Sequence, residues 1–173
     1  MMKMNAKEIE KIALNTKLNN IVKKFPDNTE ICKTILKQLG NNTTKIEEDK
    51  KSEVTLYIAI QDKISIGNTH ESFTRIQTIA HECLHSIQDR KMLIFNFIYS
   101  NMYLLYFTII CILVIIRRID NIMLYSNIFL ILSFIYYAIR VFLENDAMIK
   151  AQYVAKEYMQ KQEVITEEEI NKI

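Results

Sequence analysis

Two histidines and a glutamate within five residues form the pattern with the clearest chemical potential in this chain. They lie in His81-Glu82-Cys83-Leu84-His85, which contains two of the three histidines of the sequence. Histidines four residues apart lie on one face of a helix, so both imidazoles can reach one zinc ion. Glu82 can then accept a proton from a water molecule that the metal activates. The motif predicts zinc as cofactor, His81 and His85 as ligands, and Glu82 as general base.

The residues around this motif have the periodicity of a helix. Apolar side chains recur three and four residues apart, at Phe73, Ile76, Ala80, Cys83, Leu84 and Ile87. The histidines lie about 100° round the helix from the residues that precede them. We therefore expect the helix to bury one face and to present its histidines to a cleft. Cys83 is on the apolar stripe and is expected in the core, not on the metal.

Two long stretches without formal charge follow the motif. Met92 to Ile116 covers 25 residues and Ile122 to Ile139 covers 18. Runs of this length and composition are typical of membrane spans. The short segment from Arg117 to Asn121 would join them as a helical hairpin, which ends near Phe142. We expect the motif helix to continue directly into the first span, which would place the active site at the bilayer surface.

Charge predicts the orientation of this hairpin. The start of the chain lacks the apolar core of a signal peptide, and basic residues are more numerous on the side of the termini than in the loop. The positive-inside rule then predicts a two-span protein of the cell membrane, with both termini and the active site cytoplasmic. The basic residues on that side are Arg75, Arg90, Lys91, Arg140, Lys150 and Lys156.

A third zinc ligand is expected directly after the second span. A hairpin of two spans returns the chain to the side that it left, so Glu144 and Asp146 re-emerge beside the histidines. Catalytic zinc takes three protein ligands and keeps one open position. We favour Glu144 as the ligand, on a helix that runs to about Gln162, with Asp146 orienting a histidine. Candidate donors for the oxyanion are Tyr153, Tyr158 and His70.

Turn and cap signals organise the first half of the chain. A first helix should extend to about Lys24 and stop at Pro26. Asp27 can cap a second helix through its spacing from Glu30, and Gly40 can end it. By the same spacing, Thr166 with Glu169 can cap a short last helix. The polar stretch from residue 41 to residue 53 is expected to be a loop.

A β-hairpin is predicted between this loop and the motif. Val54 to Ile60 alternates apolar and polar residues, and Ile64 and Ile66 begin a return strand that Gly67 closes. Such a strand can edge a peptidase cleft and pair with an extended substrate, or it can be a plain structural hairpin.

These elements predict a mainly α fold with a short β-hairpin and a two-helix transmembrane hairpin. We expect a helical region at residues 1–50, the strand and motif helix at 51–91, the transmembrane hairpin at 92–142, and a helix with the third ligand at 143–173. The net charge of +2, with dispersed lysines, argues against a nucleic-acid partner. Three scattered cysteines argue against disulfides. The expected partners are the lipid bilayer and a peptide or protein segment near its surface.

The complete pattern resembles a known family. The His-Glu-x-x-His motif followed by Ile87-Gln88, the membrane hairpin and Glu144-Asn145-Asp146-Ala147 resemble the bacterial membrane-bound neutral zinc metallopeptidases, over residues 54 to 160. This distant, gluzincin-like resemblance implies a zincin-like fold, zinc on His81, His85 and Glu144, and Glu82 as general base. Leu84 stands where the family usually has glycine, and Met148 departs from its serine. A second gluzincin-like group, of soluble peptidases, shares the short motifs, but the membrane hairpin argues against it.

The resulting hypothesis is a membrane-anchored zinc metallopeptidase of the His-Glu-x-x-His type. The charges of Glu71, Arg75, Asp89 and Arg90 argue against an intramembrane protease, because they make the motif helix interfacial. Two alternatives remain: a catalytically inactive metal-binding scaffold or regulator, and a non-enzymatic two-span membrane protein.

Overall fold

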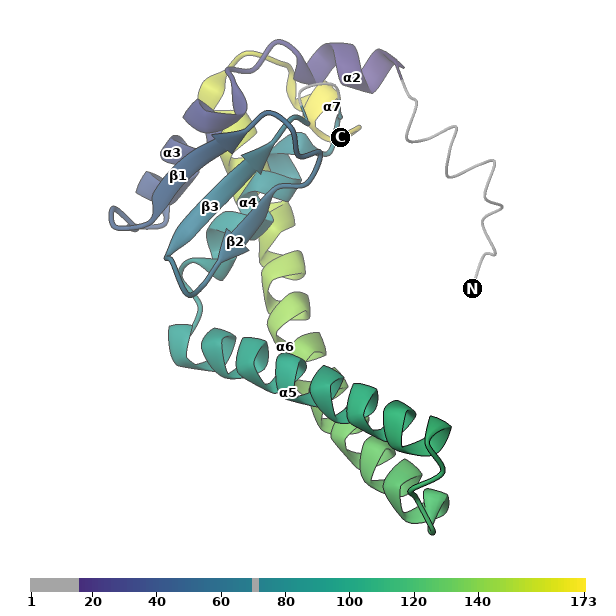
Figure 1. Cartoon of the computed structure of the whole chain (residues 1–173). Coiled ribbons are helices and arrows are strands. Elements are labelled where there is room, and N and C mark those ends of the chain that lie inside the picture. The colour runs from purple at the N-terminus through teal and green to yellow at the C-terminus, as the bar shows by residue number, and fades with distance from the viewer. Residues whose placement is uncertain (1–15, 70–71) are drawn as a thin grey trace. The chain divides into compact units, whose positions relative to one another are not determined.

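A computed structural model describes residues 16–69 and 72–173, and this part of the chain is mainly helical with a small sheet (Figure 1). The predicted first helix is present here as its C-terminal part, and its beginning lies outside the described residues, as does His70. The elements are α2 (Thr16–Val22), α3 (Asn28–Gln38), β1 (Lys45–Asp49), β2 (Leu56–Ile58), β3 (Lys63–Gly67), α4 (Arg75–His85), α5 (Arg90–Ile115), α6 (Ile122–Gln162) and α7 (Glu167–Ile170).

The chain divides into two compact units. The first contains Met1–Ile87 and Ala147–Ile173, and the second contains Gln88–Asp146. The boundary near residue 146 falls inside α6, which is one uninterrupted helix of 41 residues. The predicted helix to about Gln162 is confirmed, and it is continuous with the second apolar stretch. No glycine or proline occurs between Ile122 and Gln162, so the sequence contains nothing that would break the helix there.

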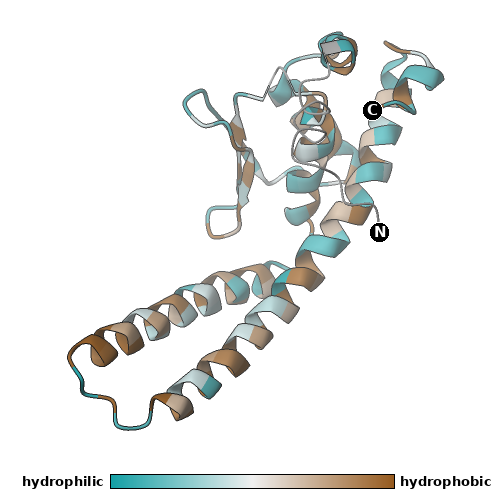
Figure 2. Ribbon diagram, turned by 90° about the vertical axis from the view of Figure 1, so that its right-hand side faces the viewer, coloured by the Kyte–Doolittle hydropathy of each residue, from teal (hydrophilic) through white to brown (hydrophobic). Residues whose placement is uncertain are grey.

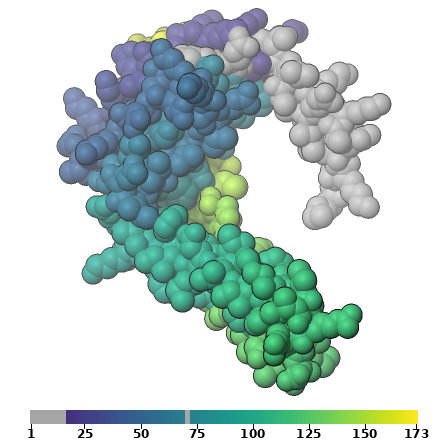
Figure 3. Space-filling model, viewed as in Figure 1, coloured from purple at the N-terminus to yellow at the C-terminus, as the bar shows by residue number. Residues whose placement is uncertain are grey.

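The sheet has three strands in the order β1-β3-β2. The antiparallel pair of β2 and β3 confirms the predicted hairpin, with Tyr57 opposite Ile64. Strand β1 pairs parallel with β3 and lies in the stretch 41–53 that we expected to be a loop, so that prediction is wrong. Its sequence, Lys-Ile-Glu-Glu-Asp, lacks apolar alternation, and only its pairing with the distant β3 makes it a strand. In the space-filling view the strands form the blue surface turned to the viewer (Figure 3).

Gly67 closes β3 because no larger residue fits there. A Cβ at this position would lie 2.7 Å from the backbone atoms of Val54. The Gly67 N–H donates a 3.1 Å hydrogen bond to the Thr55 hydroxyl. The two chain segments thus approach each other more closely than any side chain would allow.

The core of the first unit lies between the sheet and the helices. Helix α3 packs on α4 and β1, while α4 also contacts β2 and β3. Ala147, Ala151 and Ala155 recur every four residues on α6, and these small side chains are all buried in the same core. Cys83 is fully buried there with its Sγ 3.6 Å from that of Cys32, which confirms its place in the core. The other buried members are Val22, Phe25, Ile31, Ile35, Leu36, Ile64, Ile66, Ile76, Ile79, Ala80, Leu84, Tyr158, Met159 and Ile170.

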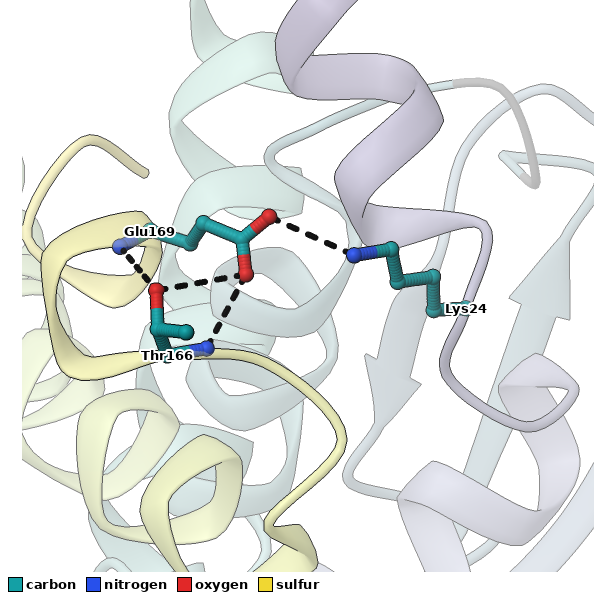
Figure 4. A network of polar contacts seen from close by, with 3 residues as sticks. All are labelled: Lys24, Thr166 and Glu169. Atoms are coloured by element: carbon teal, nitrogen blue, oxygen red, sulfur yellow. Dashed lines mark hydrogen bonds and ion pairs between the residues drawn. The ribbon is translucent and has the colours of Figure 1, made fainter.

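The predicted helix caps are confirmed. The Asp27 side chain accepts a 2.8 Å hydrogen bond from the Glu30 N–H at the start of α3. Gly40 follows that helix with a φ of 73°, the left-handed conformation that glycine adopts readily. Thr166 and Glu169 form a reciprocal capping box at α7, and the Glu169 carboxylate also pairs with Lys24 at 3.3 Å (Figure 4).

Arg75, the first residue of α4, is buried. Its side chain is 1% exposed, so it belongs to the core of the first unit and not to the exposed basic residues. The guanidinium donates four hydrogen bonds to groups in and after α2, namely the carbonyls of Val22, Phe25 and Pro26 and the side-chain oxygen of Asn28. Burial lowers the pKa of Arg75 from its ordinary value. This cation ties the start of the motif helix to the preceding helices.

The motif helix does not continue into the first apolar helix, contrary to the sequence-based expectation. Helix α4 ends at His85, and α5 begins at Arg90. The Ser86 hydroxyl donates to the Cys83 carbonyl at 2.6 Å, and the Asp89 carboxylate caps α5 by accepting from the Lys91 N–H. Short polar side chains compete in this way for backbone groups, so they favour helix ends over helix interiors.

The second unit is built from two apolar helices. Helix α5 and α6 are each long and apolar enough to cross a membrane, with mean hydropathies of 2.0 and 1.9 in their most apolar windows. No residue of either window is buried, unlike those of a core helix in a soluble protein. Brown and white ribbon predominates along this part of both helices (Figure 2). Tyrosines join the helices, since the Tyr103 hydroxyl bonds with that of Ser133 and Tyr99 donates to the Leu132 carbonyl.

Candidate metal centre

Helix α4 turns the two motif histidines toward each other. Their Nε2 atoms are 3.0 Å apart, and the two rings are nearly perpendicular at 85°. Two imidazole nitrogens that each bind one zinc at 2.0–2.1 Å in tetrahedral geometry are separated by about 3.3 Å. The observed separation of His81 and His85 is close to that value. The histidine pair therefore fits a shared metal ion.

Glu144 completes a group of three possible ligands. One ligand atom each from His81, His85 and Glu144 lies within 4.8 Å of the other two, so this group could hold a metal ion. Glu144 precedes by one helical turn Ala147, where α6 is buried in the core. Among the described residues, the group contains Glu144 and not Asp146. The Asp146 carboxylate accepts a 3.1 Å hydrogen bond from the Gln88 side chain.

The donor set consists of two imidazole nitrogens and one carboxylate oxygen, at the edge of the buried core. Two imidazole nitrogens and one carboxylate oxygen are typical ligands of zinc in hydrolytic enzymes. His85 is 9% exposed, whereas His81 and Glu144 are partly exposed. A fourth ligand would need to come from water or a substrate, since three protein groups leave a tetrahedral ion one position.

The carboxylate of Glu82 is held by the backbone of the edge strand. The Tyr57 N–H donates a 2.6 Å hydrogen bond to Glu82 Oε2, across 25 residues of sequence. Because β2 lies at the edge of the sheet, this N–H is available to α4. Sequence reasoning missed this contact. Its only signal is the alternating strand just before the motif, which does not say which backbone group faces the helix.

A chain of side-chain hydrogen bonds supports this strand from the other end of α4. The Tyr57 hydroxyl donates to Asp62 at 3.1 Å, and the Thr44 hydroxyl donates to the same Asp62 oxygen at 2.8 Å. Asn41 then donates to the hydroxyls of Thr44 and Ser86, at 2.8 and 2.9 Å. The network therefore links Ser86, the residue after the second histidine, to the strand that holds the Glu82 carboxylate.

Removing the Tyr57 N–H should change the behaviour of Glu82 without removing the metal. We expect Tyr57→Pro to move the acid limb of the pH–rate profile to higher pH by about one unit, because a hydrogen bond to an ionised carboxylate favours that form. Proline is tolerated on an edge strand when its N–H is not part of the ladder. The measurement is kcat/KM against pH for cleavage of a fluorogenic peptide.

Tyr57→Ala is the matched control, because it removes the same ring and hydroxyl but keeps the N–H. Its acid limb should stay at the wild-type position. An equal displacement of both profiles would show that the side chain, and not the backbone donor, positions Glu82.

The predicted oxyanion donors on α6 lie away from this group. Tyr158 is fully buried, packs 6.1 Å from the ring of Phe25, and has its pKa raised to about 12, chiefly by burial. Tyr153 is 73% exposed. At 1.5 Å per residue they lie about 13 and 21 Å along the helix from Glu144. Both suggestions are wrong for this geometry, and His70 lies outside the described residues.

Comparison with known proteins identifies no relative of this chain. No family model matches the chain, and no curated protein or solved structure matches it either.

Proposed function

We propose that the protein is a zinc metallopeptidase that hydrolyses peptide bonds with Glu82 as general base. The observation that carries this proposal is the group of His81, His85 and Glu144, whose ligand atoms lie within 4.8 Å of one another. The backbone N–H of Tyr57 holds the Glu82 carboxylate through a 2.6 Å hydrogen bond. The family resemblance of the sequence points to the same chemistry and to a zincin-like arrangement of edge strand and motif helix.

The residues of this group have separate roles. His81, His85 and Glu144 would hold a zinc ion, which when bound supplies Lewis-acid activation of water and of the scissile carbonyl. Glu82 accepts the proton of the attacking water on its carboxylate and passes it to the nitrogen of the leaving amine. The Tyr57 N–H stabilises the ionised carboxylate before the proton arrives. Asp62, Thr44 and Asn41 fix the strand that presents this N–H.

We further propose that α5 and the first part of α6 anchor the protein in the cell membrane. Their apolar windows are not buried by the protein, and exposing that much apolar surface to water would be costly. Arg117 and Arg118 are the only basic residues in the loop sequence 117–121, and the segments on the side of the two termini contain more. By the positive-inside rule this difference supports a cytoplasmic site. The substrate would then be a peptide or protein segment near the inner membrane surface.

Replacing the general base tests the enzymatic part of the proposal. We expect Glu82→Gln to lower kcat by about 10²- to 10⁴-fold, because glutamine cannot accept the proton of the attacking water. Zinc content should stay near that of wild type, since Glu82 is not a ligand. The measurement is hydrolysis of a quenched fluorescent peptide library by zinc-loaded protein in detergent, beside metal analysis of the same sample.

Glu53→Gln provides the matched control, because it makes the same chemical change at an exposed position and should leave kcat unchanged. Zinc-loaded wild type that cleaves no peptide in the library would favour the metal-binding scaffold over the peptidase.

A further inference from the structure

A hollow beside His81 lies within the first unit of the structure. Its volume is about 240 Å³, and α4 and α6 form its walls. With His81 neutral, none of the described residues that line it carries a formal charge. These residues are Thr74, Gln77, Thr78, His81, Met148 and Ala151. Because His81 belongs to the candidate metal group, a side chain in this hollow would be adjacent to any bond cleaved there.

We propose that this hollow is the specificity pocket of the peptidase and that it selects an uncharged apolar side chain beside the cleaved bond, with Met148 as the selecting residue. This inference rests on the proposed function. The hollow is large enough for a leucine or phenylalanine side chain. A charged side chain would lose hydration there without gaining an oppositely charged partner among the lining residues.

Met148 is the lining residue of this pocket that can be exchanged without disturbing the core. Its side chain is 53% exposed, whereas Ala151, one turn further along α6, is 1% exposed and is part of the core. Methionine is flexible and polarizable, so it can pack against apolar groups of different shape. A change at Ala151 would disturb the core, but Met148 can change without unpacking the helix. The identity of residue 148 should therefore set the preference of the pocket.

A second hollow lies further along α6, away from the candidate metal group. It has a volume of about 350 Å³, shares Gln77 with the first, and extends along α6 to Lys156 and Met159 beside α7. From Met148 to Met159 the helix rises about 16 Å, which matches roughly five residues of extended chain. Two hollows that share Gln77 and extend over this length of helix suit an extended peptide more than a compact small molecule.

Binding of labelled peptides can test the pocket independently of turnover. The probes are fluorescein-labelled decapeptides of alanine, glycine and glutamine with one varied residue, either leucine, phenylalanine, aspartate or lysine. Their dissociation constants are measured by fluorescence anisotropy on full-length, zinc-loaded Glu82→Gln protein in detergent. We expect the leucine and phenylalanine peptides to bind at least about 10-fold more tightly than the charged ones, as is typical of apolar specificity pockets.

Two charge-introducing variants make the assignment specific. Met148→Lys should reverse the preference in favour of the aspartate peptide, whereas Ile149→Lys should keep the wild-type order. Ile149 is the matched control, because it is 60% exposed on the same helix and does not line the hollow. Equal affinities for all four peptides, or the same change in both variants, would overturn the pocket. Selective binding without cleavage by wild type would support the pocket and refute the peptidase.

Discussion

Replacement of Glu144 by alanine should remove zinc from the protein, while replacement of Asp146 should not. We expect about one zinc ion per chain in wild type and less than roughly one tenth of that in Glu144→Ala after dialysis against a chelator, because two imidazoles alone hold zinc weakly. The reason for distinguishing the two carboxylates is geometric. Glu144 lies in the group with the two histidines, whereas Asp146 accepts a hydrogen bond from Gln88.

The measurement is metal analysis of detergent-purified variants together with competition against a fluorescent zinc chelator. Asp146→Ala should keep its zinc, with an affinity lowered by at most about 10- to 100-fold, which is the effect of losing an outer supporting group. His85→Ala is the positive control for complete loss. If Asp146→Ala lost its zinc and Glu144→Ala retained it, the assignment of the third ligand would be reversed. Retention of zinc by both would indicate a different ligand.

Replacement of Arg75 by methionine should destabilise the first unit strongly, because four hydrogen bonds of a buried cation are lost. The variant loses four charge-assisted hydrogen bonds, and the carbonyl oxygens of Phe25 and Pro26 lose the guanidinium as their donor. Each buried polar group left unpaired costs about 1–3 kcal/mol, so the loss of several such bonds should cost several kcal/mol. Since domains are stable by only about 5–15 kcal/mol, this would be a large fraction of the total. Methionine preserves length and apolar contacts, so the loss would report the polar network.

Cysteine reactivity offers a direct readout of this unfolding. Cys32 and Cys83 are fully buried, and the hydrogen bond between the two thiols, together with burial, raises the pKa of the Cys83 thiol. Both thiols should therefore react with a maleimide only when the first unit unfolds. A urea titration in detergent, sampled by maleimide pulses, should give a much lower midpoint for Arg75→Met than for wild type.

Lys24→Met is the matched control for this titration. It also replaces a cation by methionine, but Lys24 forms only a half-exposed ion pair with Glu169 (Figure 4). Exposed pairs contribute little to stability, so its midpoint should remain close to that of wild type. If both variants had the same midpoint, Arg75 would not organise the junction of α2, α3 and α4.

If the Arg75 and Tyr57 variants give the expected results, helix α4 is supported at both of its ends. Arg75 fixes its beginning against the loop after α2, and Ser86 fixes its end through Asn41. Histidines in the last two turns of a helix held in this way would be kept in position before any metal binds. Such preorganisation is what a catalytic site requires of the elements that carry it.

Local signals in the sequence determined several features by themselves. The spacing of His81 and His85 requires one helical face, and the helix is present with Cys83 on its buried side. Asp27, Gly40 and Thr166 each cap or end the helix that their type predicts, because capping depends on contacts within four residues. Two apolar helices follow from composition and length alone.

Other features were decided only by the tertiary structure. Strand β1 has a charged, exposed sequence and is a strand through its pairing with β3, which no local pattern encodes. Arg75 resembles a surface residue in sequence, yet four acceptors brought together by α2 and the following loop allow its burial. Likewise, the bond from Tyr57 to Glu82 depends on which groups face one another across distant segments. Periodicity reports the face on which a side chain lies, but its partner is set by the packing of elements far apart in the chain.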